Sequence, residues 1–436
     1  MKNFDFKLWF AFVLIFFIPS FVNIVRLHFI GNMPNEWGFN IASQIQWLNI
    51  LYEIVKEAFL IPLFFMLAQA LKGGEAKLFN NVLGGLFLVM AVHIALSLGI
   101  FLFAEEFLSG VKQSAELIAE SAVYIKLESI AILLSVVTEY LIVYLAIVHD
   151  FKRIIRLSLW KMVLLIGADI LLISEMPFSL GLGVKGIAIS NIAINTLLVL
   201  FVLSNMRLRQ FLSGRQLRFD FDWLKQWMKL GAFSGAESLV RNTAFALMIL
   251  GMINQIGEQG AYWVANSIIW GILLVPSLAL AEVVKRDVAN NVDAIRENTL
   301  TYLKQTGLFA LLWLVSIPLW EPFLVEVLKI DQPETVLEIM LVQTAFYIVF
   351  MFNYGVLDST IKGLGITRYM LYQSIIVDIG YYAAVFVLYL NGIVQMTLLN
   401  ISLVFGIGMV IDMLPTVWLY LKALKQHDIR LIELVK

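Results

Sequence analysis

The sequence contains no cysteine, which excludes disulfide bonds, thiolate catalysis and cysteine-ligated zinc or iron–sulfur sites. It has only four histidines, too scattered to match the spacing of a metal site: His28, His93, His149 and His427. The nucleotide-binding loop G-x-x-x-x-G-K-[ST] is absent, as are the hydrolase motifs H-E-x-x-H and G-x-S-x-G. We therefore expect no cofactor, no metal site, no enzymatic activity and no direct use of ATP.

Charge is also scarce. Charged residues make up 14% of the 436, and a net charge of −1 predicts no nucleic-acid partner. Hydrophobic residues make up 61%, and twelve apolar runs reach the length of about 20 residues that crosses a bilayer as a helix. The runs cover approximately residues 8–30, 43–70, 79–103, 115–147, 155–173, 184–205, 225–253, 262–284, 300–320, 335–361, 369–390 and 395–421. The sequence therefore predicts an all-α integral membrane protein, with the lipid bilayer as its surroundings.

Lysine and arginine are distributed unevenly between the predicted loops. The loops opposite the N-terminus contain only Lys112, Lys185 and Lys329, whereas those on the N-terminal side contain fourteen basic residues, from Lys72 to Arg368. Basic residues are retained on the cytoplasmic side of a membrane. We therefore expect an inner (cytoplasmic) membrane protein with both termini in the cytoplasm, which requires an even number of spans.

The spans form two groups of six that resemble each other. Ile41-Ala-Ser-Gln-Ile-Gln-Trp47 is similar to Val264-Ala-Asn-Ser-Ile-Ile-Trp270, and Leu67-Ala-Gln-Ala-Leu-Lys72 to Leu280-Ala-Glu-Val-Val-Lys285. We predict an N-terminal six-helix bundle (1–205), a cytoplasmic linker (206–224), a C-terminal six-helix bundle (225–421) and a cytoplasmic tail (422–436). Both halves would insert the same way round, with a substrate cavity between them, as in carriers that work by alternating access.

Two opposite charges occur one helical turn apart in the seventh span. A charge at the bilayer centre costs about 2.5–3.5 kcal/mol on insertion scales, so Glu237 and Arg241 are strong site candidates. Their i,i+4 spacing lets the two side chains meet. The pair then either fixes helix packing as a structural ion pair or acts as a switch that protonation of Glu237 would open.

The second span also concentrates polar residues. Tyr52, Glu53, Lys56 and Glu57 lie within one and a half turns, and the interpretation is either a self-neutralising structural cluster or a site for a cation or proton. Tyr52 is also a candidate for stacking against a cationic ligand. Arg26, near the outer end of the first span, either supplies a counter-charge or extends to the membrane interface.

Further carboxylates occur singly in apolar surroundings. Glu139 in the fourth span is followed by tyrosines, and Asp358 in the tenth span is preceded by Asn353 and Tyr354 and followed by Ser and Thr. Polar residues gathered in a membrane span indicate a face turned to a cavity. We take Glu53, Glu57, Glu237 and Asp358 as candidates for ion coupling. The candidates for lining a substrate cavity are Arg26, Tyr52, Glu139, Arg241, Asn353 and Tyr354.

Three glycine-containing segments stand out at the ends of predicted spans: Gly183-Val-Lys-Gly-Ile-Ala-Ile-Ser190, Gly231-Ala-Phe-Ser-Gly-Ala-Glu-Ser238 and Lys362-Gly-Leu-Gly-Ile-Thr-Arg368. They resemble segments of the multidrug and toxic compound extrusion (MATE) family, within the wider superfamily that includes polysaccharide and lipid-linked oligosaccharide flippases. The last is similar to the family's R-G-x-G-x-T-[RK] turn. Relatives carry an acid where this chain has Arg26, a Glu near the position of Arg241, and a Pro where it has Phe233. Ion coupling would therefore use relocated acids.

The resemblance implies a secondary active transporter that exports organic cations or amphipathic drugs in exchange for Na⁺ or H⁺. We expect it to act as a monomer on small amphipathic molecules by rocking two bundles around a central cavity. The alternative is a flippase of lipid-linked or anionic amphipathic substrates, in which Arg26 and Arg241 would bind the substrate. A cavity rich in basic residues would favour the flippase, and one rich in acids and aromatics would favour the exporter.

Overall fold

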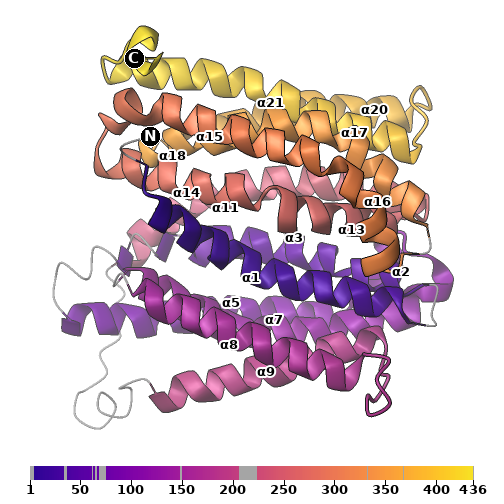
Figure 1. Cartoon of the computed structure of the whole chain (residues 1–436). Helices are drawn as coiled ribbons and strands as arrows, with labels where there is room; N and C mark the ends of the chain where they lie inside the picture. Colours follow the sequence, from indigo (N-terminus) through magenta and orange to yellow (C-terminus); the bar gives the residue numbers. More distant parts are fainter. Residues whose placement is uncertain are drawn as a thin grey trace. The chain divides into compact units, whose positions relative to one another are not determined.

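The computed structural model describes residues 4–33, 37–60, 62–63, 66–67, 75–147, 150–205, 223–330, 332–366 and 368–435. All regular structure in these residues is helical, as the long apolar runs predict (Figure 1). Nine of the described helices are long and apolar enough to cross a membrane, or ten if one bent pair counts as a single span. The protein is thus a multi-pass membrane protein. Most of the predicted linker 206–224 and residues 68–72 of the second repeat pair lie outside the described residues.

Two predicted spans are not among these nine or ten. The second span is described only in part, by α2 (Gly38–Ser43), α3 (Ile45–Val55) and η1 (Lys56–Leu60). The fifth corresponds to α8 (Phe151–Leu172), which carries Arg156, Lys161 and Asp169 along its length and is therefore less apolar than the others. The number of twelve spans accordingly remains a prediction.

The chain divides into two compact units. Unit 1 contains residues 1–31 and 243–436, and unit 2 contains residues 32–242. This division differs from the predicted boundaries at two places. The first helix packs with elements from the C-terminal half, and most of the seventh span belongs with the N-terminal half. Apolar runs define where a helix starts and ends, but they do not define which helices it packs against.

Unit 2 is organised around α7, which packs against α5, α6, α8 and α9 (Figure 1). Besides α2, α3, η1 and α8, its elements are α5 (Glu75–Leu102), α6 (Ala104–Gly110), η2 (Ala115–Leu117), α7 (Ile118–Ile147), α9 (Val184–Asn205) and most of α11 (Leu224–Phe245). One core cluster includes Leu63, Val89, Val136, Tyr140 and Trp227. The Tyr140 hydroxyl donates to the Val82 carbonyl at 2.7 Å, so its polar end is satisfied within the core.

Unit 1 begins with α1 (Phe6–Gly31), which packs along α14 (Figure 1). Its other elements are η3 (Ala246–Leu250), α12 (Gly251–Gln255), α13 (Gln259–Ile268), η4 (Ile269–Leu273), α14 (Val275–Asn290), α15 (Ala294–Ser316), η5 (Ile317–Leu319), α16 (Trp320–Pro322), η6 (Phe323–Val327), α17 (Pro333–Phe352), η7 (Asn353–Asp358), α18 (Ser359–Gly363), α19 (Arg368–Ser374), η8 (Ile375–Tyr382), α20 (Ala383–Leu390), α21 (Leu398–Gln426) and η9 (Leu431–Val435). The Trp9 indole donates to the Pro276 carbonyl at 3.0 Å and ties α1 to the start of α14.

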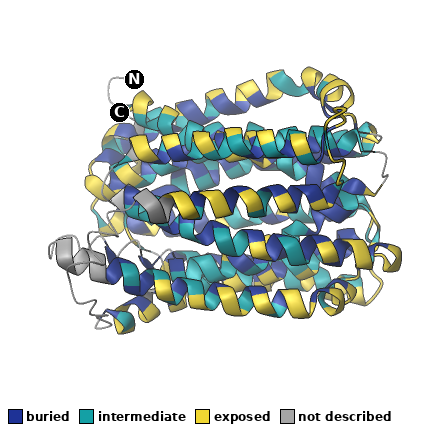
Figure 2. Cartoon of the chain, turned by 90° about the horizontal axis from the view of Figure 1, so that it is seen from below, coloured by how far each residue is buried: buried dark blue, intermediate teal, exposed yellow. Residues whose placement is uncertain are grey.

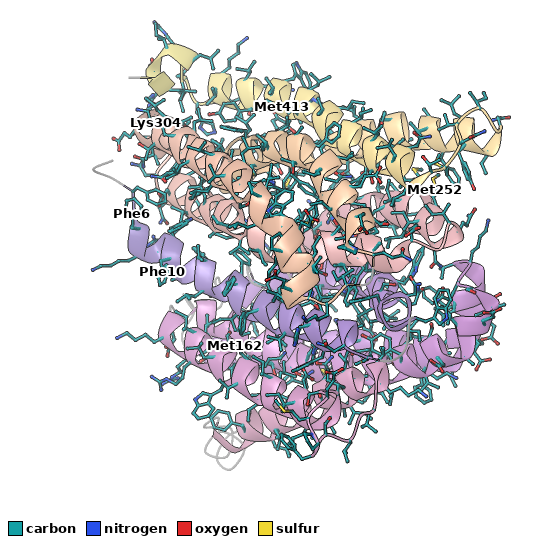
Figure 3. The ribbon with its side chains drawn as sticks, turned by 45° about the vertical axis from the view of Figure 1, so that its right-hand side comes forward. Phe6, Phe10, Met162, Met252, Lys304 and Met413 are labelled. Carbon is teal, nitrogen blue, oxygen red and sulfur yellow. The ribbon has the colours of Figure 1, made fainter. Side chains whose placement is uncertain are left out.

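The outward faces of the helices are apolar, as a bilayer requires. Along α15, Leu308, Leu311, Leu312 and Val315 are all exposed. Exposed and buried residues alternate with the helical period in many of the helices (Figure 2). On α1, Phe6 and Phe10 lie on the exposed face (Figure 3). Exposed side chains of this size in a soluble protein would cause aggregation, whereas here they contact lipid.

Several helices contain π-helical turns, and two of these accept the first helix of the opposite half. In unit 1, Ser20 of α1 lies against Gly271 in the turn η4. In unit 2, Gly231 and Gly235 of α11 lie against Ala58 in the turn η1. Each half of the sequence therefore contributes a second span whose π-helical turn holds the first span of the other half. This reciprocal packing agrees with the internal repeat in the sequence.

Candidate functional site

Arg241 bridges two carboxylates in unit 2. Its Nε donates to Glu237 Oε1 at 3.1 Å, and its Nη2 donates to Glu57 Oε1 at 2.8 Å. The prediction that Glu237 and Arg241 meet is confirmed, but the third member comes from η1, far away in the sequence. The carboxylate side chains are 17% and 12% exposed, whereas that of Arg241 is 43% exposed. The Arg241 side chain is thus the most exposed of the three.

The position of Glu57 is fixed by α11. A π-helical turn pairs each N–H with the carbonyl five residues back, so carbonyls of the turn are left for other donors. Ser234 Oγ donates to the Glu57 carbonyl at 2.7 Å, and Trp227 Nε1 donates to the Phe59 carbonyl at 3.0 Å. Between them, a Cβ on Gly231 would lie 2.1 Å from the Ala58 oxygen. The glycines of the Gly231–Ser238 motif therefore allow α11 to approach the turn that carries Glu57.

The neighbouring charges of the second span also find partners on another helix. Lys56 Nζ lies 2.8 Å from Glu139 Oε2, and Ser135 Oγ donates to Glu139 Oε1 at 3.0 Å. Glu53 is exposed and interacts electrostatically with Glu57. Lys56 therefore pairs with a residue of α7 and Glu57 with a residue of α11. The two neighbours do not neutralise each other. Lys161 also acts electrostatically on Glu139, so four carboxylates share three cations in this cluster, which leaves an excess of negative charge.

Tyr52 lies inside unit 2. It is 1% exposed, its hydroxyl shares a hydrogen bond with Ser97 Oγ, and its ring stacks on His93 at 5.9 Å between centroids. Arg26, the cavity candidate in the first span, is half-buried on α1 in unit 1. The two cavity candidates therefore lie in different units, Tyr52 in unit 2 and Arg26 in unit 1.

Unit 1 contains a second polar cluster, which begins at Asp358. Lys362 Nζ lies 3.1 Å from Asp358 Oδ2 and 4.4 Å from the centroid of the Tyr354 ring. The Tyr354 ring in turn stacks on Phe350 at 5.2 Å. An ammonium held between a carboxylate and an aromatic face is stabilised by both charge and cation–π attraction.

Asp412 on α21 is a site residue that the sequence analysis missed. Its Oδ2 accepts from Asn353 Nδ2 at 2.9 Å, and its Oδ1 accepts from Gln373 Nε2 at 2.8 Å. Asp358 and Asp378 both lie close enough to interact electrostatically with its carboxylate. The signal was present, because Asp412 is a single acid in a long apolar run like the carboxylates that were singled out. The cluster therefore joins α17, η7, α18, α19 and α21.

Gly363, which follows Lys362 in the family-like Lys362–Arg368 motif, allows two helices to pack closely. A Cβ on Gly363 would lie 2.8 Å from the Lys285 carbonyl oxygen and 2.8 Å from Val288 Cβ, so α18 packs directly on α14. Gly365 has a φ of +73°, which a residue with a side chain rarely adopts. Packing thus requires the glycine at position 363, and turn geometry favours the one at position 365. Among the described residues, no three His, Cys, Asp or Glu side chains are grouped to hold a metal ion.

The pair of Lys56 and Glu139 gives a testable prediction. Replacing Lys56 with methionine leaves Glu139 without its nearest cation and is expected to lower the free energy of unfolding by about 1–2 kcal/mol. The double variant K56M/E139Q should recover most of that loss, since no uncompensated carboxylate remains. Unfolding of the purified protein in detergent measures both. A K56M variant as stable as the wild type would contradict the assignment.

No protein-family model matches the chain, and no curated protein matches it either. Several solved structures, however, match it over nearly its whole length. A Vibrio cholerae MATE transporter, VcmN, is 16% identical, with 96% of this chain and 97% of that chain covered and a TM-score of 0.68. An inward-facing multidrug resistance MATE transporter is also 16% identical, with 96% and 95% covered and a TM-score of 0.65.

The lipid II flippase MurJ in an inward closed conformation is 12% identical, with 97% of this chain and 89% of that chain covered and a TM-score of 0.71. The proteins named in these matches are transporters and a flippase. The predicted resemblance is confirmed at the level of the fold. This chain has the fold that MATE transporters and the lipid II flippase MurJ share.

Proposed function

We propose that the protein is a secondary active transporter that exports organic cations or amphipathic drugs in exchange for Na⁺ or H⁺. The observation that supports a cationic substrate is the charge balance of the two polar clusters. In unit 2, four carboxylates outnumber three cations: Glu53, Glu57, Glu139 and Glu237 against Lys56, Lys161 and Arg241. In unit 1, Asp358 and Asp412 outnumber Lys362. A surplus of carboxylates in an apolar surrounding attracts cations and protons and disfavours anions.

Alternating access would expose these clusters to each side of the membrane in turn. The proposed arrangement has twelve spans in two pseudo-symmetric six-helix halves, both termini in the cytoplasm of the inner membrane, and a monomer as the working unit. Support comes from the distribution of lysine and arginine, the internal repeat and the reciprocal packing of α1 and α11. The large aromatic content, with 32 Phe, 14 Tyr and 11 Trp residues, suits flat hydrophobic cations.

A flippase of lipid-linked or anionic amphipathic substrates is the second candidate. One observation favours it: the Arg241 side chain is 43% exposed, more than either of its carboxylate partners, so the guanidinium is placed to bind a phosphate. Against it, the guanidinium already donates to Glu57 and Glu237, and these acids would repel an anionic substrate.

Transport by the purified protein in liposomes tests the proposal. Under an inward Na⁺ or H⁺ gradient, a fluorescent organic cation should move against its own gradient, and collapse of the ion gradient by an ionophore should stop the movement. Empty liposomes are the control. Movement that does not depend on either gradient would contradict ion exchange, and translocation of a labelled lipid-linked diphosphate in the same vesicles would support the flippase.

A further inference from the structure

Two cations from different helices of unit 1 lie against one buried tyrosine ring. Lys422 Nζ on α21 is 5.5 Å from the centroid of the Tyr369 ring and 5.3 Å from that of the Trp418 ring. Arg368 Cζ on α19 is 5.7 Å from the centroid of the same tyrosine. Tyr369 is 2% exposed, whereas Arg368 and Lys422 are both exposed. Because a ring face attracts a cation within about 6 Å of its centroid, Tyr369 holds the two charges near each other at the surface.

These cations lack the acidic partners that other basic residues of unit 1 have. Lys285 and Arg296 each pair with at least one carboxylate. In the part of the chain that the structure describes, Arg368 and Lys422 pair with none, and neither does Lys425 near the end of α21. An aromatic ring carries no net charge, so the contact with the tyrosine leaves the positive charge uncompensated. Arg368, Lys422 and Lys425, together the basic group, therefore form a surface that attracts an anion.

An apolar stripe on α21 leads directly to the basic group. Its members are exposed and spaced by three or four residues, so they lie on one helix face: Ile407, Val410, Leu414 and Trp418. Lys422 and Lys425 follow at the same spacing and continue that face. From Ile407 to Trp418 the helix rises about 16 Å, which matches the hydrocarbon of one membrane leaflet at about 15 Å. Tryptophan is typical of the boundary between hydrocarbon and headgroups, so the two lysines lie at headgroup level.

We propose that the basic group binds the headgroup of an anionic phospholipid, whose acyl chains lie along the apolar stripe of α21. The lysine and arginine side chains donate to the phosphate oxygens, and the acyl chains cover exposed side chains such as Leu414. A free phosphate would meet the same cations but gain nothing from the stripe, so the apolar face selects a lipid. The lipid binds from the membrane and joins α19 to α21. This site is independent of the proposed transport function.

Native mass spectrometry of the purified full-length protein in detergent tests the site, with phosphatidylglycerol and phosphatidylcholine of identical acyl chains added in turn. We expect the wild type to bind phosphatidylglycerol at least about tenfold more tightly, because only this lipid carries a net negative charge. The variant R368Q/K422Q should lose most of this preference, since it removes two of the three cations. The matched control is K304Q, which neutralises an exposed lysine of α15 outside the basic group and should keep the preference (Figure 3).

Each outcome decides the proposal. Equal affinity of the wild type for the two lipids overturns it, as does an unchanged preference in R368Q/K422Q. If the double variant does not fold, K425Q removes one exposed cation near the end of α21 and should weaken phosphatidylglycerol binding about threefold or more; unchanged binding then overturns the proposal. An equal loss in K304Q would mean that total charge attracts the lipid, and would overturn the assignment to the basic group. Displacement of the lipid by an equal concentration of glycerol 3-phosphate would overturn the role of the apolar stripe.

Discussion

Replacing Arg241 with methionine is expected to reduce transport by about tenfold or more and to destabilise the protein. The methionine side chain fills a similar volume, but Glu57 and Glu237 then face each other without the cation that bridges them at 2.8 and 3.1 Å. Each lost charged hydrogen bond is worth about 1.5–3 kcal/mol, reduced here because Arg241 is 43% exposed. Initial transport rates in liposomes and unfolding in detergent measure the two effects.

A series of variants separates a structural bridge from a functional one. The triple variant E57Q/E237Q/R241M removes all three charges and should recover the stability lost in R241M, because no buried ion lacks a partner. We expect transport to stay low in this variant. Recovered transport would mean that the bridge only holds α11 against η1. The matched control is R153M on α8. The Arg153 side chain is 71% exposed and its Nε lies 3.0 Å from Asp150 Oδ2, so this variant should change neither readout much.

Much of the fold could be predicted from the sequence because membrane helices are limited by local rules. A run of apolar residues of bilayer length must form a helix in lipid, and the Gly-rich turns of the two halves show the family-like pattern. The exchange of first helices between the two halves of the sequence could not be predicted. The contacts involve small residues suited to close packing, namely Ser20, Gly231 and Gly235. Their local sequence does not indicate that η4 or η1 is the packing partner.

The site was predictable to the extent that it is local. Glu237 and Arg241 are one turn apart on one helix, so their contact follows from helical geometry. The contact of Arg241 with Glu57 and that of Lys56 with Glu139 join distant segments, and only the tertiary structure shows them. The hydrogen bond from Asn353 Nδ2 to Asp412 likewise joins η7 to α21, and nothing in the local sequence indicates it.

Substitutions at Gly231 are expected to be among the most destabilising single changes in unit 2. A Cβ at this position would lie 2.1 Å from the Ala58 carbonyl oxygen, and a backbone oxygen cannot rotate away as a side chain can. The variant G231A should therefore lower the free energy of unfolding by about 3 kcal/mol or more, at the upper end of what overpacking costs. It should also separate Glu57 from Arg241, because α11 must move away from η1, and thereby reduce transport.

Gly235 provides the comparison that identifies the cause. A Cβ there would meet the Ala58 Cβ at 2.7 Å, which is a side-chain atom that can be removed. The variant G235A should be destabilised, and A58G should relieve G235A but not G231A, whose clash is with the Ala58 main chain. Gly167 on α8 has no atom within 4 Å of the same position, so G167A is the matched control and should be neutral or slightly stabilising. If A58G relieves both variants equally, the close contact of α11 with the main chain of η1 is wrong.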